Sequence, residues 1–184
     1  MNTIRSTKHV CVVAILLCLT NTALAEGQRG FSLSAGIGIS TIEDTDDGER
    51  FDGESTGFGL DVDYRFSDHF AAGLGIFSLG KDTLPFNGAD TTIKVDGTTI
   101  FARAILPVSE RVDLYGRLGY AVYSVRITPG GSLADLFGEN ATEAGIGVDV
   151  LFTEKLAVRG EGRFLNGPSE EQGSLITVGF SYRF

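Results

Sequence analysis

The chain has 184 residues, a formal net charge of −9, 25 glycines, two cysteines and no tryptophan. The acidic balance argues against nucleic acid as a partner, since a phosphate backbone is bound by a basic surface. Both cysteines lie within the first 25 residues, so the remaining 159 residues exclude a disulfide framework and a metal site built on thiolates. That length fits a single domain.

The first 25 residues have the pattern of a cleavable secretory signal peptide. Arg5 and Lys8 give a positive start, residues 10–19 are an apolar run, and Ala23 and Ala25 place small side chains where a signal peptidase cuts. An apolar run of ten residues is too short for a helix that crosses a bilayer about 30 Å thick. We therefore expect cleavage after Ala25.

The alternatives to a cleaved leader are a lipoprotein signal and a helical anchor. A lipoprotein signal would modify Cys18, but Leu17 stands where a small residue is expected. Nor does any later segment carry 18 consecutive apolar residues, which argues against an anchor helix. The sequence thus predicts a signal peptide at 1–25, and a folded domain at 26–184 that carries a charge of −11 once Arg5 and Lys8 are removed.

After the leader, apolar residues alternate with small or polar ones at a period of two. This period predicts β-strands whose two faces differ. The segments lie at about residues 31–40, 57–66, 70–77, 98–106, 112–123, 143–152, 156–164 and 176–184. The segment at 98–106 is the weakest, because Ile93 and Val95 upstream have the opposite parity to Ile100 and Ala102. A bulge near Gly97 would bring both pairs onto one face.

The connections between these segments alternate in length. Short ones fall at 67–69, 107–111 and 153–155, and long ones fall at about 41–56, 79–92, 125–141 and 165–174. Four long loops and three tight turns predict an all-β, eight-stranded antiparallel up-and-down barrel. In outer-membrane barrels the short turns face the periplasm, so we expect both termini on the periplasmic side.

The composition of the two strand faces distinguishes a membrane barrel from a soluble one. One face is almost purely apolar, and the other combines glycine and serine with equal numbers of acids and arginines. A lipocalin-like barrel would turn its charged face to water and use lysine there, whereas arginine suits confined pairing with carboxylates. We therefore expect the apolar face to contact lipid, and the interior to be closed by a charge network of Asp61, Asp63, Arg65, Arg103, Asp113, Arg117, Glu143, Asp149, Arg159, Glu161, Arg163 and Arg183.

Aromatic residues gather at the strand ends that the topology places on the periplasmic side. An aromatic girdle is expected where a barrel meets the membrane interface. Phenylalanine is also a good strand residue, so the argument rests on the group rather than on any one position. Its members are Phe31, Tyr64, Phe66, Phe70, Phe152, Tyr182 and Phe184.

The last strand carries a family resemblance. It ends in Gly-Phe-Ser-Tyr-Arg-Phe, and its alternate residues are Ile176, Val178, Phe180, Tyr182 and Phe184. With the turn segment at 64–70, it resembles the small OmpA/OmpX-like barrels of the outer membrane protein beta-barrel domain superfamily. The resemblance implies a Gram-negative cell outer membrane, contact with its lipid and lipopolysaccharide, and a C-terminal strand that is the signal for the barrel-assembly machinery. Because the chain ends at Phe184, we expect no peptidoglycan-binding domain after the barrel.

Residues for enzyme chemistry are few. Serine esterase chemistry normally needs a histidine beside the nucleophile, and the only one after the leader is His69, in a predicted turn with Ser67 and Asp68. A Ser-Asp-His string is more typical of a turn than of a triad. We therefore expect no catalytic, cofactor-binding or metal-ligating residue. The acidic loop at 42–55 is oxygen-rich, but its spacing does not match an EF-hand, and we interpret it as a solvated loop.

Three functional hypotheses follow. The first is a structural or surface-interaction barrel with a closed lumen, whose extracellular loops carry any recognition of a host or surface ligand. The second is a narrow porin-like channel for small solutes, since eight strands leave an interior that side chains can just fill. The third, least favoured, is a lipid-modifying enzyme. In each case we expect a monomer.

Overall fold

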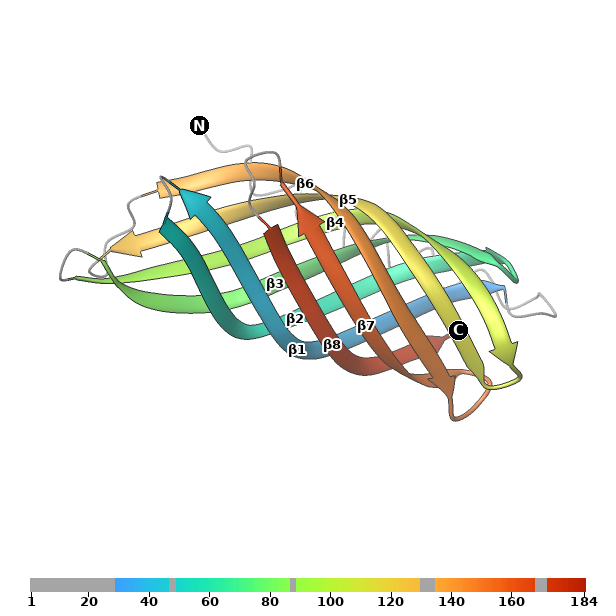
Figure 1. The fold of residues 1–184 in the computed structure, drawn as a ribbon. Coiled ribbons are helices and arrows are strands. Elements are labelled where there is room, and N and C mark those ends of the chain that lie inside the picture. The colour runs from blue at the N-terminus through green and yellow to red at the C-terminus, as the bar shows by residue number, and fades with distance from the viewer. Residues whose placement is uncertain (1–28, 47–48, 87–88, 130–134, 168–171) are drawn as a thin grey trace, which may run out of the picture.

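The computed structural model describes residues 29–184 except 47–48, 87–88, 130–134 and 168–171 (Figure 1). The predicted leader and its cleavage residues, Ala23 and Ala25, lie outside the described residues. No helix in the described ranges is long and apolar enough to cross a membrane.

Eight antiparallel strands form one closed barrel, which confirms the predicted fold (Figure 1). Each strand pairs with its neighbours in the sequence, and β8 pairs with β1 to close the wall. The strands are β1 (Gly30–Asp46), β2 (Glu49–Ser67), β3 (Phe70–Phe86), β4 (Ala89–Ser109), β5 (Val112–Pro129), β6 (Asp135–Leu151), β7 (Leu156–Asn166) and β8 (Gln172–Arg183).

The period-two pattern sets which side chains face outward. On β5, for example, Leu118 and Tyr120 are exposed, whereas Arg117 between β4 and β6 is buried in the interior. The same alternation gives every strand an apolar outer face, as predicted. Among the described residues, the two most exposed large apolar side chains, Leu118 and Ile146, lie near the middle of their strands, the part of the outer face that the sequence predicts to contact lipid.

The strands continue well into the segments predicted as long loops. β1 stays paired with β2 as far as Asp46 opposite Glu49, and β3 stays paired with β4 as far as Phe86 opposite Ala89. The loop boundaries at about 41–56 and 79–92 were therefore wrong, because these segments are mostly extended hairpins. The alternation ends before the strand does, because outside the apolar middle of the wall both faces of a hairpin can be polar while backbone pairing continues.

The predicted bulge near Gly97 was also wrong. β4 runs through Gly97 without a register shift, and the shift lies opposite it, between Ser78 and Gly80 of β3. Gly80 has a φ of +83°, which favours glycine. Ile93 and Val95 therefore keep their parity and face the interior, where Val95 is buried.

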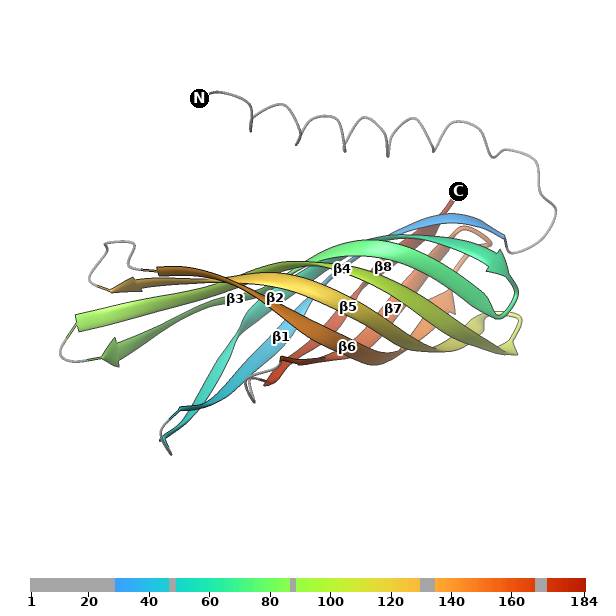
Figure 2. The ribbon, with the colours of Figure 1, turned by 90° about the horizontal axis from the view of Figure 1, so that it is seen from above.

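On the long-hairpin side of this register shift, β2 and β3 separate. Their pairing starts at Phe58 opposite Ser78, so the β1–β2 hairpin and the β3–β6 part of the wall diverge beyond that point (Figure 2). Beyond the paired part, the Ser55 hydroxyl still links β2 and β3: it donates to the carbonyl oxygen of Lys81 and accepts from the Lys81 amide, both at 3.0 Å.

An apolar cluster fills the barrel interior towards the long hairpins. We call it the apolar layer. Its buried side chains come from six strands, β3 to β8, and Ile42 of β1, Ile93 and Val125 pack against it. Its members are Phe77, Leu79, Val95, Ala121, Tyr123, Ala141, Leu165 and Leu175. The interior is thus apolar near the long hairpins and charged near the short turns.

Candidate functional site: the charged interior of the barrel

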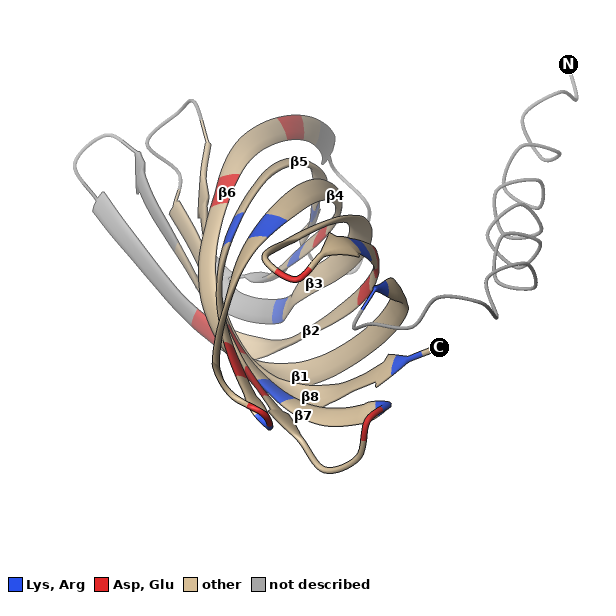
Figure 3. Cartoon of the chain, turned by 90° about the vertical axis from the view of Figure 1, so that its right-hand side faces the viewer, with Lys and Arg blue, Asp and Glu red and all other residues tan. Residues whose placement is uncertain are grey.

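The twelve side chains predicted to form the lumen network all occupy inward-facing strand positions. They come from β2, β4, β5, β6, β7 and β8, and Figure 3 shows acidic and basic positions distributed around the wall. Eleven of the twelve are buried, and the Arg183 side chain is 19% exposed. The six acids and six arginines therefore share one interior, where their formal charges balance.

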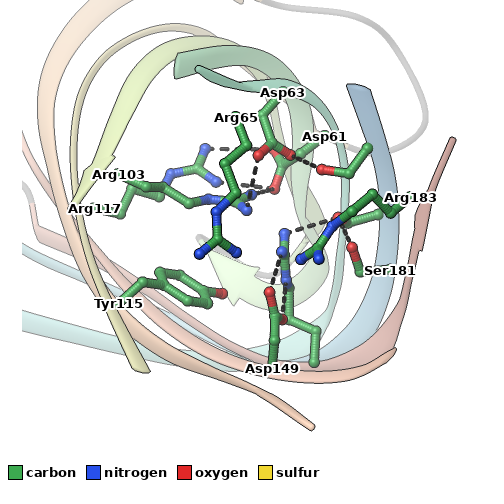
Figure 4. Close-up of polar contacts among 12 residues, drawn as sticks. Asp61, Asp63, Arg65, Arg103, Tyr115, Arg117, Asp149, Ser181 and Arg183 are labelled. Carbon is green, nitrogen blue, oxygen red and sulfur yellow. Dashed lines mark hydrogen bonds and ion pairs between the residues drawn. The ribbon is translucent and has the colours of Figure 1, made fainter. Parts of the chain in front are cut away.

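Asp61 of β2 is the centre of the network (Figure 4). Its carboxylate accepts hydrogen bonds from Arg117 Nη1 at 2.9 Å and from Arg163 Nη2 at 2.6 Å, and Arg103 Nη2 lies 3.6 Å away. Arginines from β4, β5 and β7 thus converge on a single buried carboxylate.

Two glutamates complete the pairing of these arginines. Arg117 Nε lies in ion-pair contact with Glu143. Arg163 Nε donates to Glu161, and the Tyr115 hydroxyl donates to the other oxygen of Glu161 at 2.5 Å. Each central arginine therefore has at least two carboxylate neighbours.

Nearer the short turns, separate pairs line the wall. Arg65 donates to Asp113 at 2.8 Å and to the carbonyl oxygen of Asp68 at 2.6 Å, which ties the network to the β2–β3 turn. Arg183 lies 3.9 Å from the same Asp113 carboxylate.

The most regular pair joins neighbouring strands β6 and β7. Arg159 holds Asp149 through two parallel bonds of 2.7 Å, the bidentate geometry that suits arginine. Its remaining nitrogen, Nη1, donates to the Ser34 hydroxyl at 2.8 Å, and Ser34 donates to Ser181 at 3.1 Å. Asp63 accepts one hydrogen bond on each oxygen, from Arg103 Nη1 at 3.3 Å and from the Ser32 hydroxyl at 2.7 Å.

Two aromatic residues belong to the site although the sequence did not assign them a role. The Arg117 guanidinium carbon lies 3.6 Å from the centre of the Phe101 ring, and that of Arg103 lies about 5 Å from both Phe101 and Tyr115. Both aromatics have the parity of the charged residues. Their inward position was therefore visible in the alternation, but their contact with arginine was not.

Inward-facing glycines provide the space for this network. A Cβ added to Gly75 would lie 2.1 Å from Asp61 Oδ1, and one added to Gly73 would lie 2.6 Å from the Asp63 Cβ. At the outward-facing Gly116, in contrast, an added Cβ meets nothing within 4 Å.

This contrast gives a matched pair of substitutions. We expect Gly75→Ala to destabilise the barrel by about 1–3 kcal/mol, because it overpacks the site around Asp61. Gly116→Ala should be close to neutral. Urea unfolding followed by circular dichroism checks both, and equal stability of the two variants would contradict the tight packing around Asp61.

Some buried donors of the network make no hydrogen bond within the described residues. They are Arg103 Nε and Nη2, Arg117 Nε and Arg163 Nη1, although Arg103 Nη2 and Arg117 Nε each lie in ion-pair contact with a carboxylate. A small polar cavity lies beside Arg163, lined by Ser34, Asp61, Arg159, Glu161 and Thr177 among others. Buried polar atoms in such a place are commonly satisfied by ordered water. The charged part of the interior is thus suited to hold water.

The arrangement suits charge compensation better than catalysis. Asp61 accepts from two guanidinium groups and is therefore poorly suited to act as a general base. His69 is exposed in its turn, where the Ser67 hydroxyl accepts from the amides of His69 and Phe70. Among the described side chains, no group of three histidine, cysteine or acidic residues is placed to hold a metal ion.

The residues of the predicted assembly signal lie on the outer face of β8 and, for Phe184, directly after it. Ile176, Val178, Phe180, Tyr182 and Phe184 are all exposed. Aromatic contacts join Tyr182 to Phe184 and, on the neighbouring strands, Phe31 to Tyr64, with ring centres 5.2 and 4.9 Å apart. The rings lie at the short-turn end of the barrel, where the girdle was predicted.

An apolar outer wall around a buried, charge-balanced interior defines the class of small barrels that cross a membrane with strands. Residues 10–184 match the family described as outer membrane protein beta-barrel domain. The chain belongs to this family.

Solved structures of small barrels share the fold. Ail of Yersinia pestis, solved in complex with the heparin analogue sucrose octasulfate, is 17% identical with a TM-score of 0.58, over 84% of this chain and 99% of that chain. Neisserial surface protein A is 16% identical with a TM-score of 0.59, over 84% and 97%. OprG of Pseudomonas aeruginosa is 17% identical with a TM-score of 0.57, over 86% and 98%. No curated protein matches the chain.

Proposed function

We propose that the protein is a non-enzymatic, non-conducting barrel of the outer membrane that acts through contacts made by its long hairpins. The observation that carries this proposal is the buried network around Asp61, in which arginine and carboxylate side chains occupy the lumen and compensate one another. A filled, charge-balanced lumen supports a closed barrel, and it favours a surface role over the alternative of a narrow porin-like channel.

The proposed orientation places the short turns and both termini in the periplasm and the long hairpins at the cell surface. It is supported by the usual arrangement of bacterial barrels, in which the longer connections are extracellular. The same proposal includes removal of residues 1–25 after Ala25 and assembly through the outward face of β8.

The charge at the hairpin end favours a particular kind of partner. The segments 41–57, 79–97, 123–142 and 165–174 contain fourteen acidic and four basic residues. Ail was solved with a polyanion, but a surface with this balance repels polyanions and attracts cationic groups. We therefore propose that the hairpins contact cationic surfaces, such as basic polypeptides, rather than heparin-like ones.

Binding of charged ligands to vesicles that contain the protein tests whether the hairpins prefer cationic partners. We expect an oligolysine peptide to bind, with an affinity that falls as salt rises, and a heparin oligosaccharide not to bind. A variant with Glu43, Asp44 and Asp46 changed to their amides should bind the peptide less tightly. Binding of heparin, or peptide binding that is independent of these acids, would contradict the proposed partner class.

Planar-bilayer recording tests the closed lumen. Protein purified from outer membranes, with folding checked by heat-modifiable gel migration, should give no stable channels. A reproducible unitary conductance would instead establish the porin-like alternative. Hydrolysis of lipid A or phospholipid that is lost on changing His69 would establish the enzyme alternative.

A further inference from the structure

We infer that the apolar layer closes the lumen by itself, so that the barrel stays sealed to ions when the charge pairs below it are removed. This inference deepens the proposed closed state, on which it rests, and names the residues that form the barrier. It concerns the interior between the charged network and the long hairpins, a region to which the sequence assigned no role.

The first argument is that the layer spans the interior. Phe77, Tyr123 and Leu175 come from β3, β5 and β8 and are at most 9% exposed. On β2, a Cβ added to the inward-facing Gly57 would lie 2.5 Å from Leu175 Cδ1, so Leu175 covers that position. Over β4, Phe77 fills the space at Gly97 in the same way, with its Cζ 2.4 Å from an added Cβ.

The second argument is that the buried serine hydroxyls beside the layer are already engaged. The Ser40 hydroxyl donates to the carbonyl oxygen of Leu79 at 2.5 Å, and the Ser78 hydroxyl donates to that of Val95 at 3.3 Å. An ion that passes the layer would therefore lose its hydration shell without gaining a replacement, which is costly in an apolar environment.

The third argument is the contrast with the charged part of the interior. That part contains buried donors on Arg103 and Arg163 that make no hydrogen bond, and a small cavity lined in part by Asp61 and Glu161. Its Arg183 side chain is partly exposed at the short-turn end. Water can thus enter the network from that end, whereas the apolar layer has buried carbon atoms in the corresponding place. The two parts oppose ion passage by different physical means.

The test compares variants of the two parts of the interior. Two pairs of alanine substitutions, which we call charge deletions, each remove one arginine and one acid. They are Arg159→Ala with Asp149→Ala and Arg117→Ala with Glu143→Ala, and neither leaves a single unpaired charge. A third variant combines the first deletion with Leu165→Ala and Leu175→Ala. Ion flux is measured in vesicles and in planar bilayers on full-length protein expressed and matured in a Gram-negative host, with folding confirmed by gel migration.

We expect both charge deletions to remain as closed as the wild type, and the combined variant to raise ion flux by about tenfold or more, because the desolvation barrier is lost. Conduction by a charge deletion whose apolar layer is intact would overturn the inference. So would a combined variant that folds but stays closed. Conduction by the wild-type protein would instead refute the proposed closed state, so the two failures are distinguishable.

A milder variant keeps the test informative if the leucine truncations prevent folding. Ala121 and Ala141 are buried in the apolar layer and lie directly opposite each other on β5 and β6. Replacing both with serine adds two hydroxyl groups with little change in volume. In the Arg159→Ala, Asp149→Ala background this pair should raise ion flux above that of the charge deletion alone, and an unchanged flux would count against the inference.

Discussion

Replacing Asp61 with alanine should destabilise the barrel by about 3–5 kcal/mol, the usual cost of leaving buried charges uncompensated. Arg117, Arg163 and Arg103 converge on this carboxylate and would lose it together. Urea unfolding of the reconstituted protein, followed by circular dichroism and by gel migration, measures the loss. Asp61→Asn should also lose stability, because it keeps the volume but not the charge.

The control for this substitution is Glu154→Ala, which removes an acidic side chain from an exposed turn and should change stability little. A second control adds Arg163→Ala to Asp61→Ala. If Asp61 acts by compensating charge, the double variant should be more stable than the sum of the two single losses predicts. Strict additivity would show that the two side chains act independently.

Placing arginine at the outward position of Leu118 should reduce stability in lipid vesicles by about 2–4 kcal/mol, because this position lies near the membrane midplane. Leu118 is 71% exposed and lies near the middle of β5. Val108→Arg, near the short-turn end of β4, provides the matched control, with an expected cost of about 0–1 kcal/mol close to the interface. The measurement is the urea midpoint in vesicles, with the inserted fraction determined separately.

This comparison also tests the alternative of a soluble barrel. In water an exposed arginine in place of an exposed leucine would be neutral or would improve solubility. A depth-dependent loss, large at Leu118 and small at Val108, is expected only if the outer face contacts hydrocarbon. Equal and negligible effects at the two positions would refute the membrane assignment.

The outer face was predictable from the sequence because lipid constrains every second residue of a spanning strand. Phe58, Leu60 and Tyr64 on β2 follow the predicted parity, and so do the inward Asp61 and Asp63. The preference for arginine indicated that these charges lie in a confined space.

The partners within the network could not be predicted in the same way. Asp61 binds Arg163, which is 102 residues away on β7, because closure of the barrel brings β2 and β7 across from each other. Alternation specifies a face but not a neighbour across the lumen. The apolar layer could not be predicted for a related reason. Inward Val95 and Leu175 are of the same residue types as outward residues, so the sequence predicts a bulge near Gly97 where the structure has interior packing.

The separation of these partners along the chain has a consequence for how the barrel is made. Ser34 meets Ser181 across 147 residues, and Asp61 meets Arg163 across 102. Contacts between such distant residues form slowly, because the chain loses the entropy of a large loop before they contribute. Until β8 pairs with β1, the barrel has no enclosed interior in which the arginines and carboxylates can pair. Before closure these charged side chains are therefore more stable in water than in the bilayer. Assembly should therefore be all-or-none, with burial of the charges and entry into the bilayer occurring in the same step as closure of the β1–β8 seam.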